Sequence, residues 1–79
     1  MRGYHFKTTI AGFDFWFEKL TLKNNEQLFF VSSNIQDERS FFMSKSTEGS
    51  WMILYHNILG KEVLLLEHDL SEAIREQGY

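Results

Sequence analysis

The sequence contains no cysteine. This absence excludes disulfide bonds, thiolate zinc sites and a catalytic thiol. It fits a reducing compartment, although many exported bacterial domains also lack cysteine. A chain of 79 residues has room for one domain only. A domain of this size buries only about 60–65% of the surface that its unfolded chain exposes. Without disulfides, the usual further sources of stability are a metal ion or a partner subunit.

Long apolar segments are absent as well. Residues 1–10, MRGYHFKTTI, contain no apolar run of the length found in signal peptides. No segment approaches the roughly 18 apolar residues of a membrane-spanning helix. These features predict a soluble, cytoplasmic protein that has no membrane partner.

Basic clusters are also missing. The formal net charge is −3, from eight Lys and Arg and eleven Asp and Glu, and the basic residues are scattered along the chain. A protein that binds duplex nucleic acid normally carries a basic patch, because phosphate contacts supply most of the affinity. The charge pattern therefore disfavours nucleic acid as a partner. Acidic residues gather towards the C-terminus, at Glu62, Glu67, Asp69, Glu72 and Glu76.

Motifs for catalysis or cofactor binding do not occur. The sequence has no Gly-x-Ser-x-Gly elbow, no glycine-rich phosphate loop and no dinucleotide fingerprint. His5, His56 and His68 lack the spacing of a metal motif. A zinc site built in space from His5, His56 and a carboxylate is an alternative that we disfavour. Glu67 and Asp69 do not face each other on a helix. We therefore expect no catalytic residue, no metal, no cofactor and no enzymatic activity.

Aromatic residues are abundant, at 16% of the chain, and eight of them are phenylalanine. Apolar and polar residues alternate with a period of two along much of the chain, which predicts β-strands. Turn residues recur about every ten positions, the spacing of an antiparallel meander. Ala11-Gly12 and Asn24-Asn25 tolerate the backbone conformations of tight turns. The expected strands are residues 3–10, 13–23, 27–33, 39–45 and 51–56.

The C-terminal part has a different period. Apolar residues fall on one stripe of an α-helix. We expect one helix over residues 61–77, packed on one face of the sheet in a single α+β domain spanning 1–79. In an alternative reading, residues 62–66 form a sixth strand, and Asp69 caps a shorter helix with Glu72 three residues on. The stripe that should contact Phe13, Phe15 and Phe17 consists of Leu59, Val63, Leu66, Leu70 and Ile74.

The segment FDFWFEKLTL, residues 13–22, carries large apolar side chains on both sides. Its phenylalanines occupy odd positions, whereas Trp16, Leu20 and Leu22 occupy even ones. This change of phase indicates either a β-bulge near residues 18–19 or apolar residues on both faces of the sheet. A helix of about 17 residues is about 25 Å long and covers one face of a five-stranded sheet. Something else must cover the second face.

Three explanations account for a second apolar face. The sheet closes into a small barrel, two chains pack sheet to sheet or through an edge strand, or the face binds a ligand or another protein. We favour a homodimer, which also supplies the core that a small domain lacks. The leading hypothesis is thus a non-catalytic protein-interaction module that self-associates, with another protein partner as an option. The residues selected for this interface are Trp16, Phe29, Phe42 and Met52.

Two other functions are weighed against this hypothesis. Exposed aromatic side chains on a sheet act as stacking platforms for single-stranded nucleic acid. The third option is a small-molecule carrier with an apolar pocket between helix and sheet. The platform would use Trp16, Phe42 and Trp51, with Lys7, Lys19 and Lys45 along the nucleic-acid backbone.

The segments GSWMIL and DLSEAIREQGY resemble small uncharacterised bacterial proteins that combine a β-meander with one C-terminal amphipathic helix. The likeness covers residues 49–79. Its motifs are a Gly-x-Trp turn that opens the last strand and a Leu-x-x-Ala-Ile ending of the helix, and both mainly describe core packing. This group has no assigned activity, so the resemblance implies the fold and transfers no site.

Overall fold

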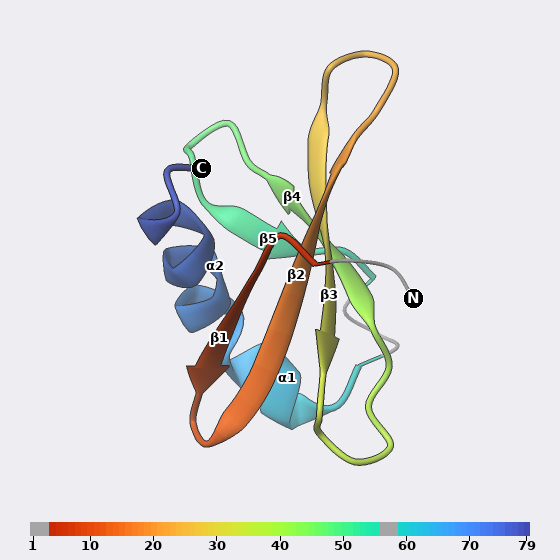
Figure 1. Cartoon of the computed structure of the whole chain (residues 1–79), viewed down its shortest axis with the longest axis vertical. Coiled ribbons are helices and arrows are strands. Elements are labelled where there is room, and N and C mark those ends of the chain that lie inside the picture. The colour runs from red at the N-terminus through yellow and green to blue at the C-terminus, as the bar shows by residue number, and fades with distance from the viewer. Residues whose placement is uncertain (1–3, 56–58) are drawn as a thin grey trace.

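The computed structural model describes residues 4–55 and 59–79, which form an antiparallel sheet followed by a helical segment (Figure 1). The described strands pair in chain order, β1-β2-β3-β4-β5, which confirms the α+β meander with a C-terminal helix. The strands are β1 (Phe6–Ile10), β2 (Phe13–Thr21), β3 (Gln27–Ser33), β4 (Phe41–Lys45) and β5 (Trp51–Ile53). The helices are α1 (Lys61–Leu65) and α2 (Glu67–Glu76).

The turn between β1 and β2 is the tight turn that the sequence predicts. Ala11 and Gly12 both have positive φ, 53° and 84°. Positive φ at both central residues defines a type I′ turn, whose twist matches that of paired strands. Ile10 and Phe13 close the hairpin, and the pairing continues to Phe6 and Phe17.

The turn between β2 and β3 is one residue longer than an Asn24-Asn25 turn. The Leu22 N–H donates to the Glu26 carbonyl oxygen at 2.8 Å, so residues 23–25 form a three-residue loop. Asn25 closes this loop in the left-handed region, with φ 67°. Thr21 consequently pairs with Gln27, and odd-numbered residues of β2 face odd-numbered residues of β3.

β2 contains no bulge. Its register with β3 runs without interruption from Phe15 opposite Ser33 to Thr21 opposite Gln27. Of the two explanations for the change of phase, the bulge near residues 18–19 is therefore wrong. Leu20 lies on the same face as Trp16, and β2 carries apolar side chains on both faces.

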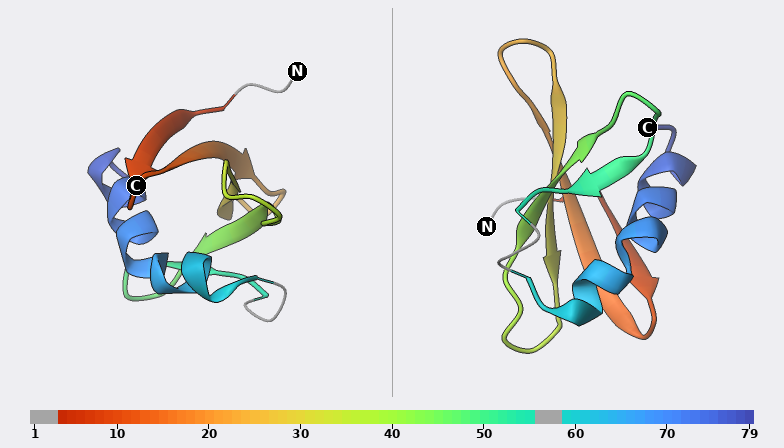
Figure 2. Two further views of the ribbon diagram at one scale, coloured as in Figure 1. Left: turned by 90° about the horizontal axis from the view of Figure 1, so that it is seen from below. Right: turned by 180° about the vertical axis from the view of Figure 1, so that it is seen from behind.

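The sheet curls around the helical segment, which lies on its concave side (Figure 2). α2 contacts both edge strands, β5 and β1. Within the described residues β1 and β5 do not pair with each other, so the sheet stays open and does not form the alternative barrel. Phe15 and Phe17 of β2 belong to the same buried core cluster as Leu59, Val63, Leu70 and Ile74 of the helix stripe, and Phe13 and Leu66 are partly buried against it. The members of this core are Phe15, Phe17, Phe29, Val31, Ile35, Phe41, Met43, Trp51, Ile53, Leu59, Val63, Leu70, Ala73 and Ile74.

Four strand boundaries differ from the expected ones. β2 ends at Thr21 and not at residue 23. β4 begins at Phe41 and not at residue 39, and β1 begins at Phe6, while Gly3 lies outside the described residues. β5 ends at Ile53. Tyr55 has φ 59°, a left-handed conformation that does not continue a strand. His56, the last residue of the expected strand 51–56, also lies outside the described residues.

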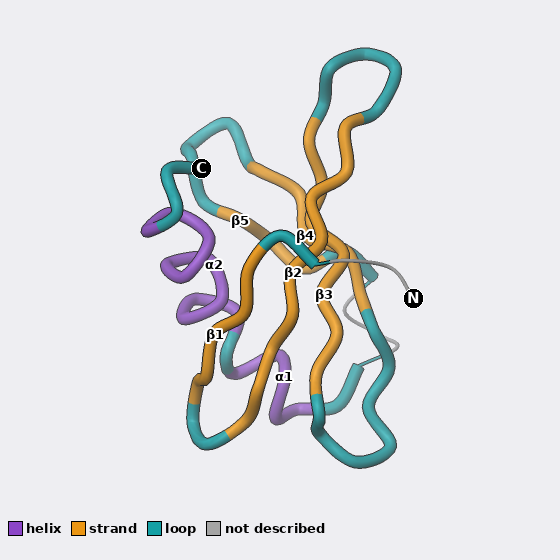
Figure 3. The backbone as a smooth tube through the Cα atoms, viewed as in Figure 1, coloured by secondary structure: helices purple, strands orange, loops and turns teal. Residues whose placement is uncertain are grey.

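The C-terminal segment is helical but interrupted once within the described residues (Figure 3). Leu66 ends α1 and begins α2, with φ −94° and ψ 3°. The alternative sixth strand at residues 62–66 is not formed. Asp69 accordingly lies in the first turn of α2 and not at its N-cap. In this position its negative charge interacts favourably with the helix dipole. Gly78, at φ 94°, follows the last turn.

α2 is attached to the free edge of β5 by hydrogen bonds. The backbone N–H of Trp51 donates to Ser71 Oγ at 2.9 Å. The backbone N–H of Ile53 donates to Glu67 Oε2 at 2.7 Å. Glu67 and Ser71 are one helical turn apart and therefore reach alternate amides of the same strand. An exposed strand edge invites pairing with other chains, and these side chains occupy that edge.

Candidate interaction surface

The face of the sheet opposite the helices carries a group of apolar side chains, here called the convex apolar surface. Residues of one parity in neighbouring strands meet on this face, because side chains alternate along each strand. Phe30 lies between Glu18 and Phe42 in the register of β2, β3 and β4. The surface consists of Trp16, Leu20, Leu28, Phe30, Phe42, Met52 and Leu54.

Cross-strand contacts hold the centre of this surface together. The rings of Phe30 and Phe42 have centroids 4.9 Å apart and are tilted by 52°. Leu20 is directly opposite Leu28, and Ser44 separates Leu28 from Met52 in the next row. Met52 is 46% exposed and the other members are half-buried. The apolar area thus extends across β2, β3, β4 and β5.

Charges near Trp16 are paired within the chain. Lys7 Nζ lies 5.5 Å from the centroid of the Trp16 ring. The same Nζ is 3.7 Å from Asp14 Oδ2, and Thr9 Oγ1 donates to Asp14 Oδ1 at 2.8 Å. A partner that covers Trp16 therefore meets a cation whose charge is already balanced.

The structure places three of the four selected interface residues on one face. Trp16, Phe42 and Met52 belong to the convex apolar surface, with Trp16 and Met52 at its opposite ends. The selection of Phe29 is wrong. Phe29 is 0% exposed and packs in the core, with its ring centroid 5.0 Å from that of Trp51. The three-residue loop before β3 pairs Phe29 with Lys19, whereas a two-residue turn would place it beside Leu20.

The selection also missed part of the surface. Leu20, Leu28, Phe30 and Leu54 occupy the same face but were not selected. Alternation within the strand indicates Leu20, four positions from Trp16, and Leu54, two positions from Met52. It does not indicate Leu28 and Phe30, whose face depends on the length of the turn before β3. Phe29 and Phe30 are equally apolar, so the pattern within β3 does not distinguish its two faces.

The predicted stacking platform for single-stranded nucleic acid is not assembled from the residues proposed. Trp51 is 1% exposed and lies in the core. Lys19 and Lys45 lie on the helix side, where both contact Tyr79. Lys19 Nζ is 4.8 Å from the centroid of the Tyr79 ring, and Lys45 Nζ donates to the Tyr79 backbone oxygen at 2.6 Å. Of the proposed set, Trp16, Phe42 and Lys7 remain on the convex side.

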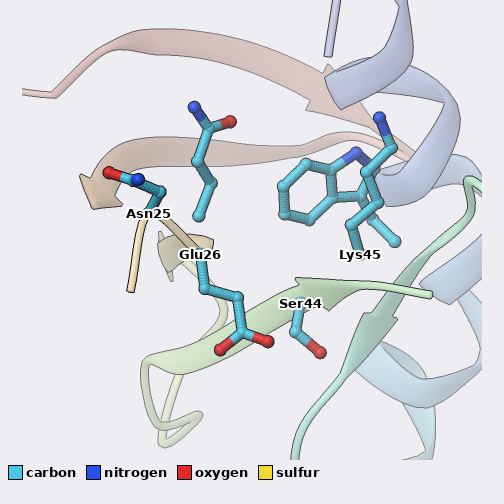
Figure 4. A pocket seen from close by; sticks show the side chains of 6 residues that line it. Asn25, Glu26, Ser44 and Lys45 are labelled. Carbon is cyan, nitrogen blue, oxygen red and sulfur yellow. The ribbon is translucent and has the colours of Figure 1, made fainter. Parts of the chain in front are cut away.

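A hollow of about 270 Å³ lies where β3 begins and β4 ends (Figure 4). Asn25 and Glu26 line it on one side, and Ser44 and Lys45 on the other, with Gln27 and Trp51 completing it. Five of these six residues have polar or charged side chains, and the hollow does not lie between helix and sheet, where the pocket of a small-molecule carrier is expected. The buried side chains of the core lie between α2 and the sheet.

The histidines of the described chain have ordinary polar partners. His5 Nε2 is 2.7 Å from the Tyr79 hydroxyl oxygen, and His68 Nε2 is 3.8 Å from Glu72 Oε1. Within residues 4–55 and 59–79, no three side chains of His, Asp or Glu converge on a common point that would hold a metal ion. His56, part of the disfavoured zinc alternative, is outside these ranges. No helix in the described ranges is long and apolar enough to cross a membrane.

Comparisons of the chain with protein-family models, with curated proteins and with solved structures found no match. The resemblance of residues 49–79 to small bacterial meander proteins therefore remains a prediction.

Proposed function

We propose that this protein is a non-catalytic interaction module that self-associates through the convex apolar surface. The observation that carries the proposal is the group of apolar side chains that extends from Trp16 on β2 to Met52 on β5, on the sheet face away from the helices. Exposed apolar patches of this kind usually mark recognition sites. Covering the patch also adds buried apolar area, at about 25 cal/mol per Å², to a domain that has little of it.

The distribution of charge supports a second copy of the chain as the partner. The acidic residues of α1 and α2 lie on the concave side of the sheet, away from the convex apolar surface. Two copies that meet through their convex faces keep these acidic helices far apart, so like charges are not brought together. The same patch on both subunits is the arrangement of a two-fold dimer.

A pair of matched variants tests this function. Met52→Glu introduces a charge at the most exposed position of the convex apolar surface. Leu65→Glu introduces the same charge at an 81% exposed leucine of α1, away from the sheet face. We expect sedimentation velocity to report a dimer for the wild type and for Leu65→Glu, and a monomer for Met52→Glu. If both variants remain dimeric, the dimer uses another surface and this assignment is wrong.

A further inference from the structure

The two edges of the sheet differ in their hydrogen bonding: side chains of α2 bond to the edge of β5, and no helix side chain bonds to the edge of β1 in the described residues. This difference points to a second binding site. In a type I′ hairpin the closing pair is hydrogen-bonded, so Ile10 bonds to Phe13. Hydrogen-bonded and non-bonded pairs then alternate along antiparallel strands. The backbone N–H and C=O groups of Lys7 and Thr9 therefore point away from β2, towards the open edge of β1.

These outward groups have no backbone partner beyond the sheet among the described residues. The corresponding amides at the opposite edge, those of Trp51 and Ile53, are bonded to side chains of α2. Both Lys7 and Thr9 are exposed. The β1 edge is thus a row of available donors and acceptors, which is the template for adding a strand.

The surface beside this edge is acidic. Glu67 and Ser71 lie on the side of α2 that faces β5, because both accept hydrogen bonds from its amides. By helical spacing, Asp69, Ala73 and Glu76 form a stripe on the other side, the side on which α2 approaches β1. Asp69 and Glu76 are exposed, whereas the small Ala73 between them is buried. A segment laid along β1 therefore runs past two carboxylates.

We propose that the β1 edge binds an extended segment of another protein that carries lysine or arginine side chains. Main-chain hydrogen bonds to Lys7 and Thr9 would supply affinity, as in other cases of strand addition. The acidic stripe of α2 would select basic side chains. A second copy is the less suitable occupant here, because pairing β1 with β1 would bring two acidic stripes towards each other. This site is separate from the convex apolar surface.

The first experiment measures binding of a short fluorescein-labelled peptide of alternating lysine and valine by fluorescence anisotropy. The control peptide has glutamate in place of lysine. We expect the lysine peptide to bind at least about tenfold more tightly, a difference of about 1.4 kcal/mol. We also expect its affinity to fall as salt is added, because exposed charges are screened. Equal affinity for the two peptides would overturn the proposal.

Variants of Thr9 test whether the backbone edge is used. Thr9→Pro removes the outward N–H, and proline is tolerated on an edge strand where its nitrogen faces solvent. Thr9→Val keeps the N–H, and both variants lose the hydroxyl that donates to Asp14. We expect Thr9→Val to bind the lysine peptide like the wild type and Thr9→Pro to lose at least about tenfold in affinity. Equal binding by the two variants would overturn strand addition.

Amide hydrogen exchange on the wild-type chain gives a test that does not depend on the folding of Thr9→Pro. The lysine peptide should slow exchange at the Lys7 and Thr9 amides and leave the Trp51 and Ile53 amides unchanged. Unchanged exchange at Lys7 and Thr9 would contradict the proposal. Protection that instead rises with protein concentration, without peptide, would identify a second copy as the occupant and would also contradict it.

Discussion

Phe29 and Phe42 carry the same side chain on opposite faces of the sheet. Phe29 is completely buried, and its ring packs edge to face against Trp51 and Phe17, with centroid distances of 5.0 and 6.2 Å. Phe42 is half-buried on the convex apolar surface, where it contacts Phe30. The two residues therefore have different effects on stability, although both belong to aromatic pairs.

Alanine substitutions at these two positions test the assignment of faces. Phe29→Ala should lower the free energy of unfolding by about 3–5 kcal/mol, since it opens a cavity in a packed core. Phe42→Ala should cost less than about 1.5 kcal/mol, because only part of its ring is removed from water. Chemical denaturation followed by circular dichroism, at low protein concentration, measures both values. A larger loss for Phe42→Ala would mean that the faces are reversed.

At the scale of elements, the attachment of α2 to β5 depends on two side chains of the helix. Ser71 is one of them and is itself buried. Its hydroxyl accepts the hydrogen bond from a buried amide, and a buried donor that loses its acceptor destabilises a fold by its full desolvation cost. This contact therefore contributes more than the exposed ion pairs of the same helix.

Ser71→Ala should lower the free energy of unfolding by about 1–2 kcal/mol. It should also speed amide exchange at Trp51 relative to the wild type. Glu72→Ala is the control, because it removes exposed contacts to His68 at 3.8 Å and Arg75 at 4.0 Å. Exposed ion pairs contribute at most about 1 kcal/mol, so this variant should change stability little. If both variants lower the free energy of unfolding by similar amounts, the hydrogen bond to the Trp51 amide stabilises the fold no more than the exposed ion pairs do.

The elements of this fold are readable from the sequence to different degrees. Alternation with a period of two predicts the meander, and the stripe from Leu59 to Ile74 predicts the helical segment. The sequence does not predict the length of the turn at Asn24, because asparagine occurs in both two-residue and three-residue loops. A difference of one residue moves a whole strand to the other face. This ambiguity, together with the equal hydrophobicity of Phe29 and Phe30, explains the misplacement of Phe29.

The candidate surface was predictable only in part for the same reason. Trp16 stands out because its neighbours Asp14 and Glu18 are charged, so its side of β2 should otherwise be polar. Phe30 has no such contrast, since Phe29 beside it is equally apolar. The sequence also does not predict the break in the helix at Leu66, because a run of leucines is compatible with a continuous helix and with an interrupted one.

At the scale of the whole molecule, Tyr79 joins segments that are far apart in the sequence. Its hydroxyl oxygen is 2.7 Å from His5 Nε2, and its ring centroid is 5.4 Å from that of Phe29. Lys45 Nζ donates to its backbone oxygen at 2.6 Å. The residue thereby ties the segment after α2 to the sheet and to the segment before β1.

Tyr79→Ala should lower the free energy of unfolding by about 1–2 kcal/mol, because it removes the aromatic contacts and the cation–π contact with Lys19. Tyr79→Phe keeps the ring and loses only the hydroxyl contact with His5, so its cost should stay below about 1 kcal/mol. Thermal unfolding followed by circular dichroism compares the two. If Tyr79→Ala and Tyr79→Phe lower the free energy of unfolding equally, the hydroxyl group alone accounts for the contribution of Tyr79, and the ring contacts contribute nothing.

Self-association through the convex apolar surface is the central claim at this scale. It is tested most directly by the absolute mass of the wild-type chain, measured by light scattering over a concentration series. We expect the mass to rise to twice the 9.4 kDa of one chain, and the Trp16→Ser variant to keep the mass of one chain at every concentration. A wild-type mass of 9.4 kDa at every concentration would contradict it.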